Sequence, residues 1–268
     1  MQNFKLNEDF LLNNQDWTFP TLTAYGPGRF KEIGKFCNNF KINNALIVTD
    51  NGSINLPFIS DLQNLLNDSK VKSAIYSNIS PNPRDDEIDS GCKKFRDGNH
   101  DAIIAIGGGS AMDGGKAISL TVNSGVSLWD FEFEKEPPKL EMENPFPKII
   151  TIPTTAGTGA ETEVTAMVTH LEKGMKFCLW HPDARPCLAL VDPELTLKLP
   201  ANLTAWTGID AMIHAIEGFS VPMFHPLCDG SAIESLNLIS KSLYVAVEEP
   251  DNLLAVSYTH LTLPTTYH

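Results

Sequence analysis

The segment DAIIAIGGGSAMDGGKAIS, residues 101–119, constrains the fold more than any other part of the sequence. Its first half is a continuous apolar run, which is typical of a strand buried on both faces of a parallel sheet. Three glycines and a helical pattern follow, so the segment predicts a strand, a tight turn and the start of a helix. The N–H groups and dipole at a helix start favour an anion such as a diphosphate.

The glycine spacing fits neither of the two common phosphate-binding motifs. Met112 stands where the third glycine of G-x-G-x-x-G would fall, counted from Gly107. Ala117 follows Lys116 where a P-loop needs Ser or Thr. A plain turn that needs glycine for a positive φ explains the same residues without a ligand. The segment alone therefore leaves a phosphate site and a structural turn both open.

Apolar runs alternate with helical patterns along the first two thirds of the chain, which predicts the α/β fold class with a parallel sheet covered on both faces. We expect strands at 45–50, 73–79, 101–110, 148–153 and 188–193 and helices near 58–68, 84–97 and 111–122. TLTAYGPGRF predicts an edge strand and a turn, and VTAMVTH with MKFCLW predicts a hairpin. Helical patterns follow from Asn202, so we expect a domain boundary near Leu195.

Composition limits the class of protein. The 268 residues are 42% hydrophobic, enough for a large core, and the net charge of -13 argues against nucleic acid or an anionic membrane as partner. The five cysteines include no CxxC pair, so neither a disulfide framework nor a zinc ribbon is indicated. We see no signal peptide pattern and no apolar run of membrane length, and expect a cytoplasmic protein.

A second loop, IPTTAGTGAETEVT at 152–165, offers Thr154, Thr155 and Thr158 as hydrogen-bond donors around two glycines. Two donor-rich loops at the ends of parallel strands are what a bound dinucleotide requires. Asp50, after an early strand, can accept hydrogen bonds from ribose hydroxyls and would repel a 2'-phosphate, which favours NAD over NADP. An Asp that only starts the turn VTDNG is an equally good reading.

The stretch WTGIDAMIHAIEGF, residues 206–219, places Asp210 and His214 one helical turn apart. Glu217 and Thr207 fall on the same polar stripe, and nearly all other positions are apolar, so we expect a helix buried on most sides. Two donors at i and i+4 can chelate one metal ion. A polar pair that faces solvent is the alternative.

Three of these segments resemble the iron-containing (group III) alcohol dehydrogenases, the family of lactaldehyde reductase, 1,3-propanediol dehydrogenase and butanol dehydrogenase. They are GGGSAMDGGKAI, IPTTAGTGAETEVT and DPELTLKLPANLTAWTGIDAMIHAIEGF, and the resemblance runs from about residue 18 to about residue 255. It implies a Rossmann-like nucleotide-binding domain at 1–195, followed at 196–255 by the start of an all-helical metal-binding domain. It also implies hydride transfer between a small primary alcohol or aldehyde and NAD, and a homo-oligomer in the full-length protein.

The resemblance also assigns site residues by position. Asp210 and His214 fall on two metal ligands, for ferrous iron or zinc that acts as a Lewis acid on the alcohol oxygen. Glu217, three residues after His214, is either a partner of His214 or a surface residue. His225 is not a ligand position in the family pattern, and it either lines a substrate pocket or caps the next helix. The cofactor-binding positions are Asp50, Asn82, Gly108, Gly109, Ser110, Asp113, Thr154, Thr155, Thr158 and Lys176.

The last residues, VSYTHLTLPTTYH at 256–268, differ in texture from the helical sequence before them. They resemble the conceptual translation of a sequencing adapter, so we expect a non-native tail on a truncated chain. His260 and His268 lie in it and are not expected to be metal ligands. Two alternatives stay open: a catalytically inactive nucleotide-binding fragment, and a relative of glycerol dehydrogenase or dehydroquinate synthase.

Overall fold

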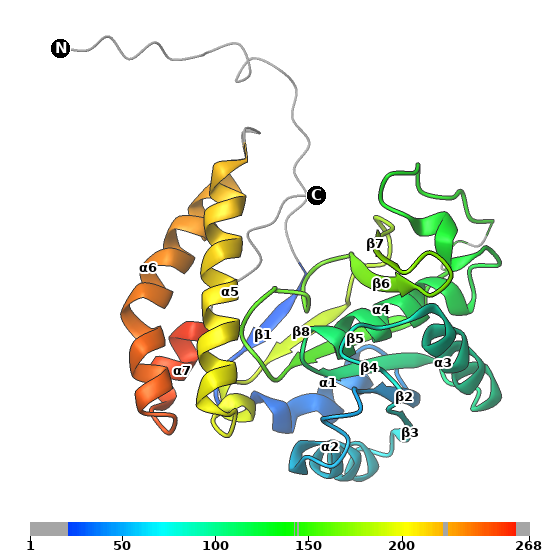
Figure 1. The fold of residues 1–268 in the computed structure, drawn as a ribbon. Coiled ribbons are helices and arrows are strands. Elements are labelled where there is room, and N and C mark those ends of the chain that lie inside the picture. Colours follow the sequence, from blue (N-terminus) through cyan, green and yellow to red (C-terminus); the bar gives the residue numbers. More distant parts are fainter. Residues whose placement is uncertain (1–20, 142, 144, 222–224, 261–268) are drawn as a thin grey trace.

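The structure of the protein is a computed structural model that describes residues 21–141, 143, 145–221 and 225–260. Figure 1 shows a sheet with helices on both faces and the C-terminal helices beside one end of it. Sheet and helices form in the order that the sequence predicts, with the strands first and the long helices last. The α/β fold class with a helical region after it is confirmed.

All neighbouring strands of the main sheet are parallel, in the order β1-β8-β5-β4-β2-β3. Its strands are β1 (Thr23–Tyr25), β2 (Asn44–Val48), β3 (Lys72–Tyr76), β4 (Ala102–Gly107), β5 (Lys148–Pro153) and β8 (Leu188–Val191). Every residue of β4 is buried, as expected of a strand covered on both faces. The predicted runs extend two or three residues beyond β2, β3 and β4. The chain forms loops after β2 and β3, and after β4 it turns at Gly108 and begins α4 at Gly109.

Side chains of β2 alternate between two hydrophobic cores, one on each face of the sheet. Leu46 and Val48 pack in the core that contains residues of α3 and α4, and Ala45 and Ile47 in the core that contains residues of α1 and α2. The helices are α1 (Ile33–Asn39), α2 (Pro57–Asp68), α3 (Asp85–Asp97) and α4 (Gly109–Val122), with short 3-10 helices η2 (Arg29–Glu32), η3 (Leu128–Phe131) and η4 (Pro193–Thr196) in connections. Burial of each large aliphatic side chain stabilises this arrangement by about 1.5–3 kcal/mol.

The winding of the sheet reverses next to β2. The chain goes from β2 to β3 at the edge and then returns past β2 to β4, β5 and β8. In open α/β sheets such a switch point, outside the carboxyl ends of the strands, is where ligands bind. Asp50 follows β2 and Gly107 ends β4, so two predicted site segments lie at this switch point.

A hairpin of β6 (Ala166–His170) and β7 (Met175–Leu179) forms the second, antiparallel sheet, as predicted. Val168 and Leu179 are fully buried in the same core as α4, so the hairpin covers that helix. Trp129 stacks on His170 with ring centroids 4.3 Å apart. The hairpin therefore packs against α4, the helix that follows the glycine-rich turn.

Three helices follow, α5 (Ala201–Ser220), α6 (Pro226–Glu248) and α7 (Leu253–His260). Helices α5 and α6 pack through small residues: Gly208, Ala211, Ala215 and Gly218 are the buried positions of α5. A Cβ on Gly208 would lie 2.2 Å from Leu243 Cδ1, so a larger residue there would force the Leu243 side chain to move. In the described ranges, no helix combines the length and apolar character needed to cross a bilayer.

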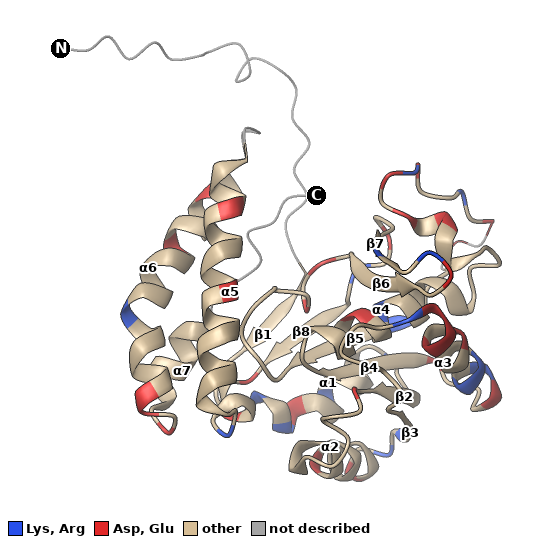
Figure 2. Ribbon diagram, viewed as in Figure 1, with Lys and Arg blue, Asp and Glu red and all other residues tan. Residues whose placement is uncertain are grey.

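The expectation that the helix around residues 206–219 is buried on most sides is wrong. Trp206 is 65% exposed, Phe219 50% and Ile213 47%, although all three are large and apolar. The reason is that α5 packs mainly on α6, along one narrow stripe of small residues. Figure 2 shows few charged residues on α5 and α6, so this exposed surface is predominantly uncharged.

Residues 256–259 belong to α7 and pack on the helices before them. Val256 and Thr259 are buried, and Thr259 Oγ1 lies 3.1 Å from Ser242 Oγ. Tyr25 Oη donates a hydrogen bond to Ser257 O (3.3 Å), which joins α7 to the first strand. The non-native origin of the tail stays a prediction, and 261–268, including His268, lie outside the described residues.

Candidate functional site

The turn between β4 and α4 needs glycine at position 107. The φ of Gly107 is +144°, and a Cβ there would lie 2.8 Å from both Ala111 Cβ and Asp50 Oδ2. Helix α4 begins two residues later at Gly109. Its first N–H groups have no acceptor within the helix, which is the arrangement that binds phosphate groups. The turn is therefore structural, and it also leaves a helix start available to an anion.

The threonine-rich loop after β5 lies against these glycines. A Cβ on Gly108 would stand 3.7 Å from Thr155 Oγ1, and one on Gly109 3.6 Å from Thr158 Oγ1. A pocket lies between the two loops, lined by Gly108, Gly109, Met112, Pro153, Thr155, Ala156, Thr158, Gly159, Ala160 and Glu161. Four of the predicted cofactor residues thus face one pocket, with hydroxyl donors on one side and the helix start on the other.

A backbone hydrogen bond couples the two loops. Thr154 N donates to Gly107 O at 2.9 Å. Gly107 is also in register with Pro153 where β4 pairs with β5. The sequence predicts a role for the hydroxyl of Thr154 as a hydrogen-bond donor to the cofactor. In the structure its backbone amide forms the hydrogen bond that joins the two loops. The side chain is 6% exposed.

A buried lysine of α4 donates a hydrogen bond to the backbone of the threonine-rich loop. Lys116 is 2% exposed, its Nζ donates to Ala160 O (2.8 Å) and lies 3.4 Å from Asp113 Oδ1. Burial raises the pKa of Asp113, while Lys116 and, more weakly, Lys176 act to lower it. Burial also raises the pKa of Glu161, to about 7. The predicted cofactor residues Asp113 and Lys176 therefore belong to the charge cluster around Lys116.

The side chain of Asp50 stabilises the turn that begins at this residue, which is the second of the two roles that the sequence suggests for it. Its Oδ1 accepts hydrogen bonds from Gly52 N and Ser53 N, both at 2.9 Å, and its Oδ2 accepts one from Ser53 Oγ at 2.8 Å. Oδ2 also lies against the turn at Gly107. The carboxylate is thus held in place by its own loop, at the switch point between β2 and β4.

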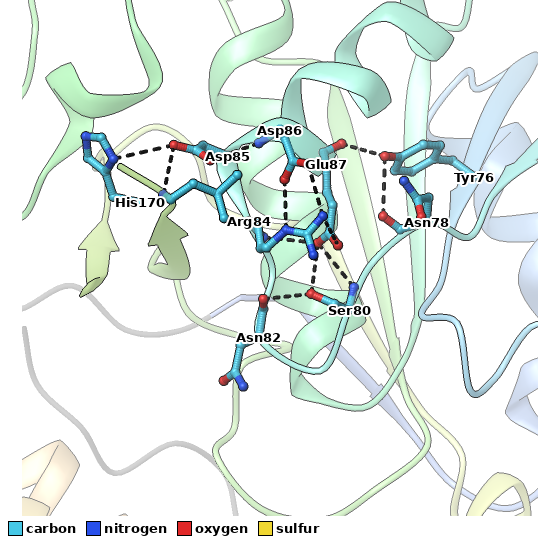
Figure 3. Close-up of polar contacts among 10 residues, drawn as sticks. Tyr76, Asn78, Ser80, Asn82, Arg84, Asp85, Asp86, Glu87 and His170 are labelled. Carbon is cyan, nitrogen blue, oxygen red and sulfur yellow. Dashed lines mark hydrogen bonds and ion pairs between the residues drawn. The ribbon is translucent and has the colours of Figure 1, made fainter. Parts of the chain in front are cut away.

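The loop that carries Asn82 lies beside the glycine-rich turn. Ser110 Oγ donates to Pro81 O (2.8 Å), and Thr169 N donates to Pro83 O (2.7 Å). Figure 3 shows the side chain of Asn82 pointing away from the neighbouring polar cluster, and the residue is exposed. The hydroxyl of Ser110, predicted as a cofactor contact, is here bonded to the loop backbone.

The predicted metal ligands share one face of α5. Asp210 Oδ1 and His214 Nε2 are 3.8 Å apart, a separation that one cation with bonds of about 2.0–2.2 Å can bridge. His214 Nδ1 lies 3.7 Å from Glu217 Oε2. A carboxylate and an imidazole fit a first-row divalent ion, as two ligands of a larger set. Within the described residues, three or more His, Cys, Asp or Glu side chains do not gather into a metal site.

The threonine-rich loop touches this face of α5. Gly157 has a φ of +133°, and a Cβ on it would lie 3.3 Å from Asp210 Oδ2 and 3.6 Å from Thr207 Cβ. The loop that lines the pocket at α4 therefore also borders the polar stripe of α5. The structure brings together segments that lie more than fifty residues apart in the sequence.

His225 caps the next helix. It is 4% exposed, and its Nδ1 accepts a hydrogen bond from Cys228 N at 3.2 Å, at the start of α6. Of the two roles that the sequence left open, the structure shows the helix cap.

Four residues around the site were not found by sequence reasoning: Ser53, Glu87, Lys116 and Gly157. Lys116 carried a signal, because a lysine three residues after Asp113 in an otherwise apolar helix must be paired when buried. Gly157 carried a weaker one, since it is one of two glycines in the loop. Ser53 contacts the side chain of Asp50, a contact without a distinctive signal in the sequence. Glu87 did carry a signal, because it stands three residues after Arg84, the spacing of a capping box at the start of α3.

A parallel sheet with glycine-rich and threonine-rich loops at its switch point, followed by long helices, defines the structural class of this chain. The profile of the family "Iron-containing alcohol dehydrogenase" matches residues 20–193, and "Fe-containing alcohol dehydrogenase family, C-terminal" matches residues 204–262. The chain belongs to the iron-containing alcohol dehydrogenase family.

Individual relatives agree with this membership. The NAD-dependent methanol dehydrogenase of Bacillus methanolicus is 33% identical over 88% of this chain and 61% of its own length. A crystal structure of 1,3-propanediol oxidoreductase has a TM-score of 0.87 and 30% identity, over 93% of this chain and 64% of the other. Sulfoacetaldehyde reductase from Bifidobacterium kashiwanohense, in complex with NAD+, has a TM-score of 0.83 and 31% identity, over 93% and 65%. The chain thus spans less than two thirds of each of these proteins.

Proposed function

We propose that this chain acts in NAD-linked, metal-dependent interconversion of a small primary alcohol and its aldehyde. Membership of an alcohol dehydrogenase family supports the reaction class, and relatives named for NAD support the cofactor. The observation that carries the proposal is the contact between Gly157 and Asp210. It sets the loop of the nucleotide pocket against the helix face that bears the candidate metal ligands.

In this proposal the two loops hold the cofactor diphosphate. The start of α4 at Gly109 and Ser110 supplies backbone N–H groups and a positive dipole end. The hydroxyls of Thr155 and Thr158 donate from the other side of the same pocket. Lys116, below the loop, orders it by holding Ala160 O.

Asp50 would set the choice between NAD and NADP. Three donors of its own turn already fix the carboxylate, so it is preoriented at the switch point of the sheet. An oriented carboxylate accepts hydrogen bonds from ribose hydroxyls and repels a 2'-phosphate. We therefore assign NAD as the preferred cofactor.

Asp210 and His214 would hold a divalent ion, ferrous iron or zinc, which supplies Lewis-acid polarisation of the alcohol or carbonyl oxygen. Asp210 contributes a negative charge and His214 a neutral nitrogen. Glu217, 3.7 Å from His214 Nδ1, would orient the imidazole so that Nε2 faces Asp210.

A second candidate function is nucleotide binding without turnover. The observation that favours it is the donor set, because among the described residues Asp210 and His214 are not joined by a third ligand. Catalytic zinc sites ordinarily have three protein ligands. Metal-dependent oxidation of an alcohol by the purified 268-residue chain distinguishes the two functions.

The cofactor assignment is tested by the affinity of the chain for NADH, measured by fluorescence. Thr158→Val removes one hydroxyl from the pocket, and we expect about tenfold weaker binding. Thr121→Val is the matched control, because its hydroxyl bonds to Ala117 O in the last turn of α4. Absence of NADH binding by the unmodified chain would overturn the assignment, and an equal loss in both variants would remove Thr158 from it.

A further inference from the structure

The loop from Ser80 to Arg84, between β3 and α3, is held by a single buried carboxylate. Glu87 is 2% exposed, and its Oε2 accepts hydrogen bonds from Ser80 N (3.2 Å) and Arg84 N (3.1 Å). One carboxylate therefore joins the two ends of the loop. Figure 3 shows these contacts converging on Glu87 from both sides.

Further bonds bring the middle of the loop into the same network. Ser80 Oγ lies 3.1 Å from Glu87 Oε2 and 2.8 Å from Asn82 O, so its one hydrogen is shared between two acceptors. Arg84 Nη2 lies 3.5 Å from Glu87 Oε1, and the same guanidinium pairs with Asp86. The opposite charge of Arg84 offsets part of the cost of burying Glu87.

The loop is also tied to the elements on either side of it. Pro81 O accepts from Ser110 at the start of α4, and Pro83 O accepts from Thr169 of the hairpin. The prolines that flank Asn82 restrict φ at both neighbouring positions. The backbone around Asn82 is thus fixed on every side, while its carboxamide points outward.

We propose that Glu87 is a positioning residue for the cofactor: it holds the Ser80–Arg84 loop so that the Asn82 carboxamide meets the nucleotide beside α4. The inference rests on the proposed function, because it takes the pocket at α4 to be the NAD site. Its specific content is that Glu87 acts through Asn82. A carboxylate that served only to stabilise α3 would have no such dependence.

Asn82→Ala, Glu87→Gln and the double variant test this as a cycle, with the Kd for NADH as readout. Glutamine keeps the shape of the Glu87 side chain. It replaces the charged carboxylate and its two acceptor oxygens with a neutral amide that has one acceptor oxygen. We expect Asn82→Ala and Glu87→Gln each to raise the Kd about tenfold. In the double variant we expect no further rise beyond Asn82→Ala alone, because a displaced loop no longer presents the amide.

Two additional variants keep the test decisive. Ser80→Ala removes one hydroxyl of the network and leaves the charges of Glu87 and Arg84 in place. It replaces Glu87→Gln in the cycle if that variant fails to fold. It should raise the Kd several-fold, and only when Asn82 is present. Asp86→Asn is the matched control, because Asp86 is exposed and binds Arg84 without touching Ser80. It should leave the Kd within about twofold of the unmodified value.

The outcomes separate the inference from the function on which it rests. If the unmodified chain binds NADH but the effects of Asn82→Ala and Glu87→Gln multiply, Glu87 does not act through Asn82 and the inference is overturned. If Glu87→Gln lowers only the thermal stability, the residue is structural and the inference is likewise overturned. If the unmodified chain does not bind NADH, the proposed function fails, and the inference fails with it.

Discussion

Gly157 packs directly against Asp210: a Cβ on the glycine would stand 3.3 Å from the carboxylate Oδ2. The glycine belongs to the loop of the candidate nucleotide pocket, and the aspartate belongs to the polar stripe of α5. This contact makes the position of one depend on the other. A methyl group at Gly157 would require the Asp210 carboxylate to shift by a few tenths of an ångström.

Gly157→Ala should therefore lower the free energy of unfolding by about 1–3 kcal/mol, because a φ of +133° is a region that non-glycine residues almost never adopt. Urea titration measures it. Gly125→Ala is the control, since Gly125 has a φ of +74° and nothing within 4 Å of its Cβ position. If the two variants lose the same stability and the same NADH affinity, the contact with Asp210 has no effect of its own.

Asp50→Gly should relax the preference for NADH over NADPH, because it removes the carboxylate that opposes a 2'-phosphate. Asp50→Asn separates charge from turn structure, since the amide oxygen can still accept from Gly52 and Ser53. Both variants should bring the ratio of the two Kd values about tenfold closer to one. Equal affinity for the two cofactors in the unmodified protein would contradict the role of Asp50.

Glu161 should make stability fall as pH rises through weakly acidic values. Its pKa is raised from 4.5 to about 7 in the folded protein, mainly by burial, with Glu163 raising it and Lys116 lowering it. Between these two values the folded protein holds more protons than the unfolded chain, so raising the pH favours unfolding, by up to about 3 kcal/mol in total.

Urea titrations at about pH 5 and about pH 8 measure this loss. Glu161→Gln should remove it and should be more stable than the unmodified protein at the higher pH only. Glu172→Gln, an exposed position in the hairpin turn, is the control. A pH dependence that is unchanged in Glu161→Gln would show that this carboxyl is ionised in the folded state.

The purified chain should retain ferrous iron or zinc only weakly, because Asp210 and His214 supply two donors where three or four are usual. Titration with Co²⁺, followed by absorbance, measures the affinity. Asp210→Ala and His214→Ala should each abolish what binding remains. His260→Ala should leave it unchanged. Stoichiometric metal that disappears in His260→Ala would overturn the ligand assignment and the predicted origin of the tail.

The exposed apolar side of α5 should be tolerant of polar substitution. Trp206 is 65% exposed, so Trp206→Ser should change the free energy of unfolding by less than about 0.5 kcal/mol. Leu243→Ala, which removes the side chain packed on Gly208, should cost about 2–4 kcal/mol. Thermal and urea unfolding of both variants measure the difference. A large loss in Trp206→Ser would mean that this side of α5 is covered in solution.

The strands of the sheet could be predicted from sequence because each one is marked by a few consecutive residues. A run such as AIIAIG in β4 is apolar at every position, and the glycines after it mark where the strand stops. The helix α5 could not be predicted equally well, since its burial depends on which elements pack against it. The helix itself is as predicted, but its large apolar residues such as Trp206 and Phe219 are exposed, whereas small ones such as Ala211 are buried.

A residue of the site could be predicted where its type and spacing alone have few explanations. Glycine at 107 and the pair at 210 and 214 have few alternatives at their spacing, whereas a contact such as Ser53 to Asp50 is one of many that a serine can make. Asp210 stands out in the sequence by its spacing to His214, whereas the role of Gly157 does not, because its contact with Asp210 depends on how the helical region meets the sheet. Such contacts become visible only in three dimensions.

The strand β1 pairs with β8, with Thr23 opposite Ala189, so the first strand of the sheet is completed by the last. During synthesis the central strands β2 to β5 can assemble while β1 has no partner. Pairing over so long a sequence separation closes a large loop and is slow. Until the segment at Leu188–Val191 leaves the ribosome, the edge of β5 stays open. Arrest of translation before that point would thus leave a nascent chain prone to edge-to-edge aggregation.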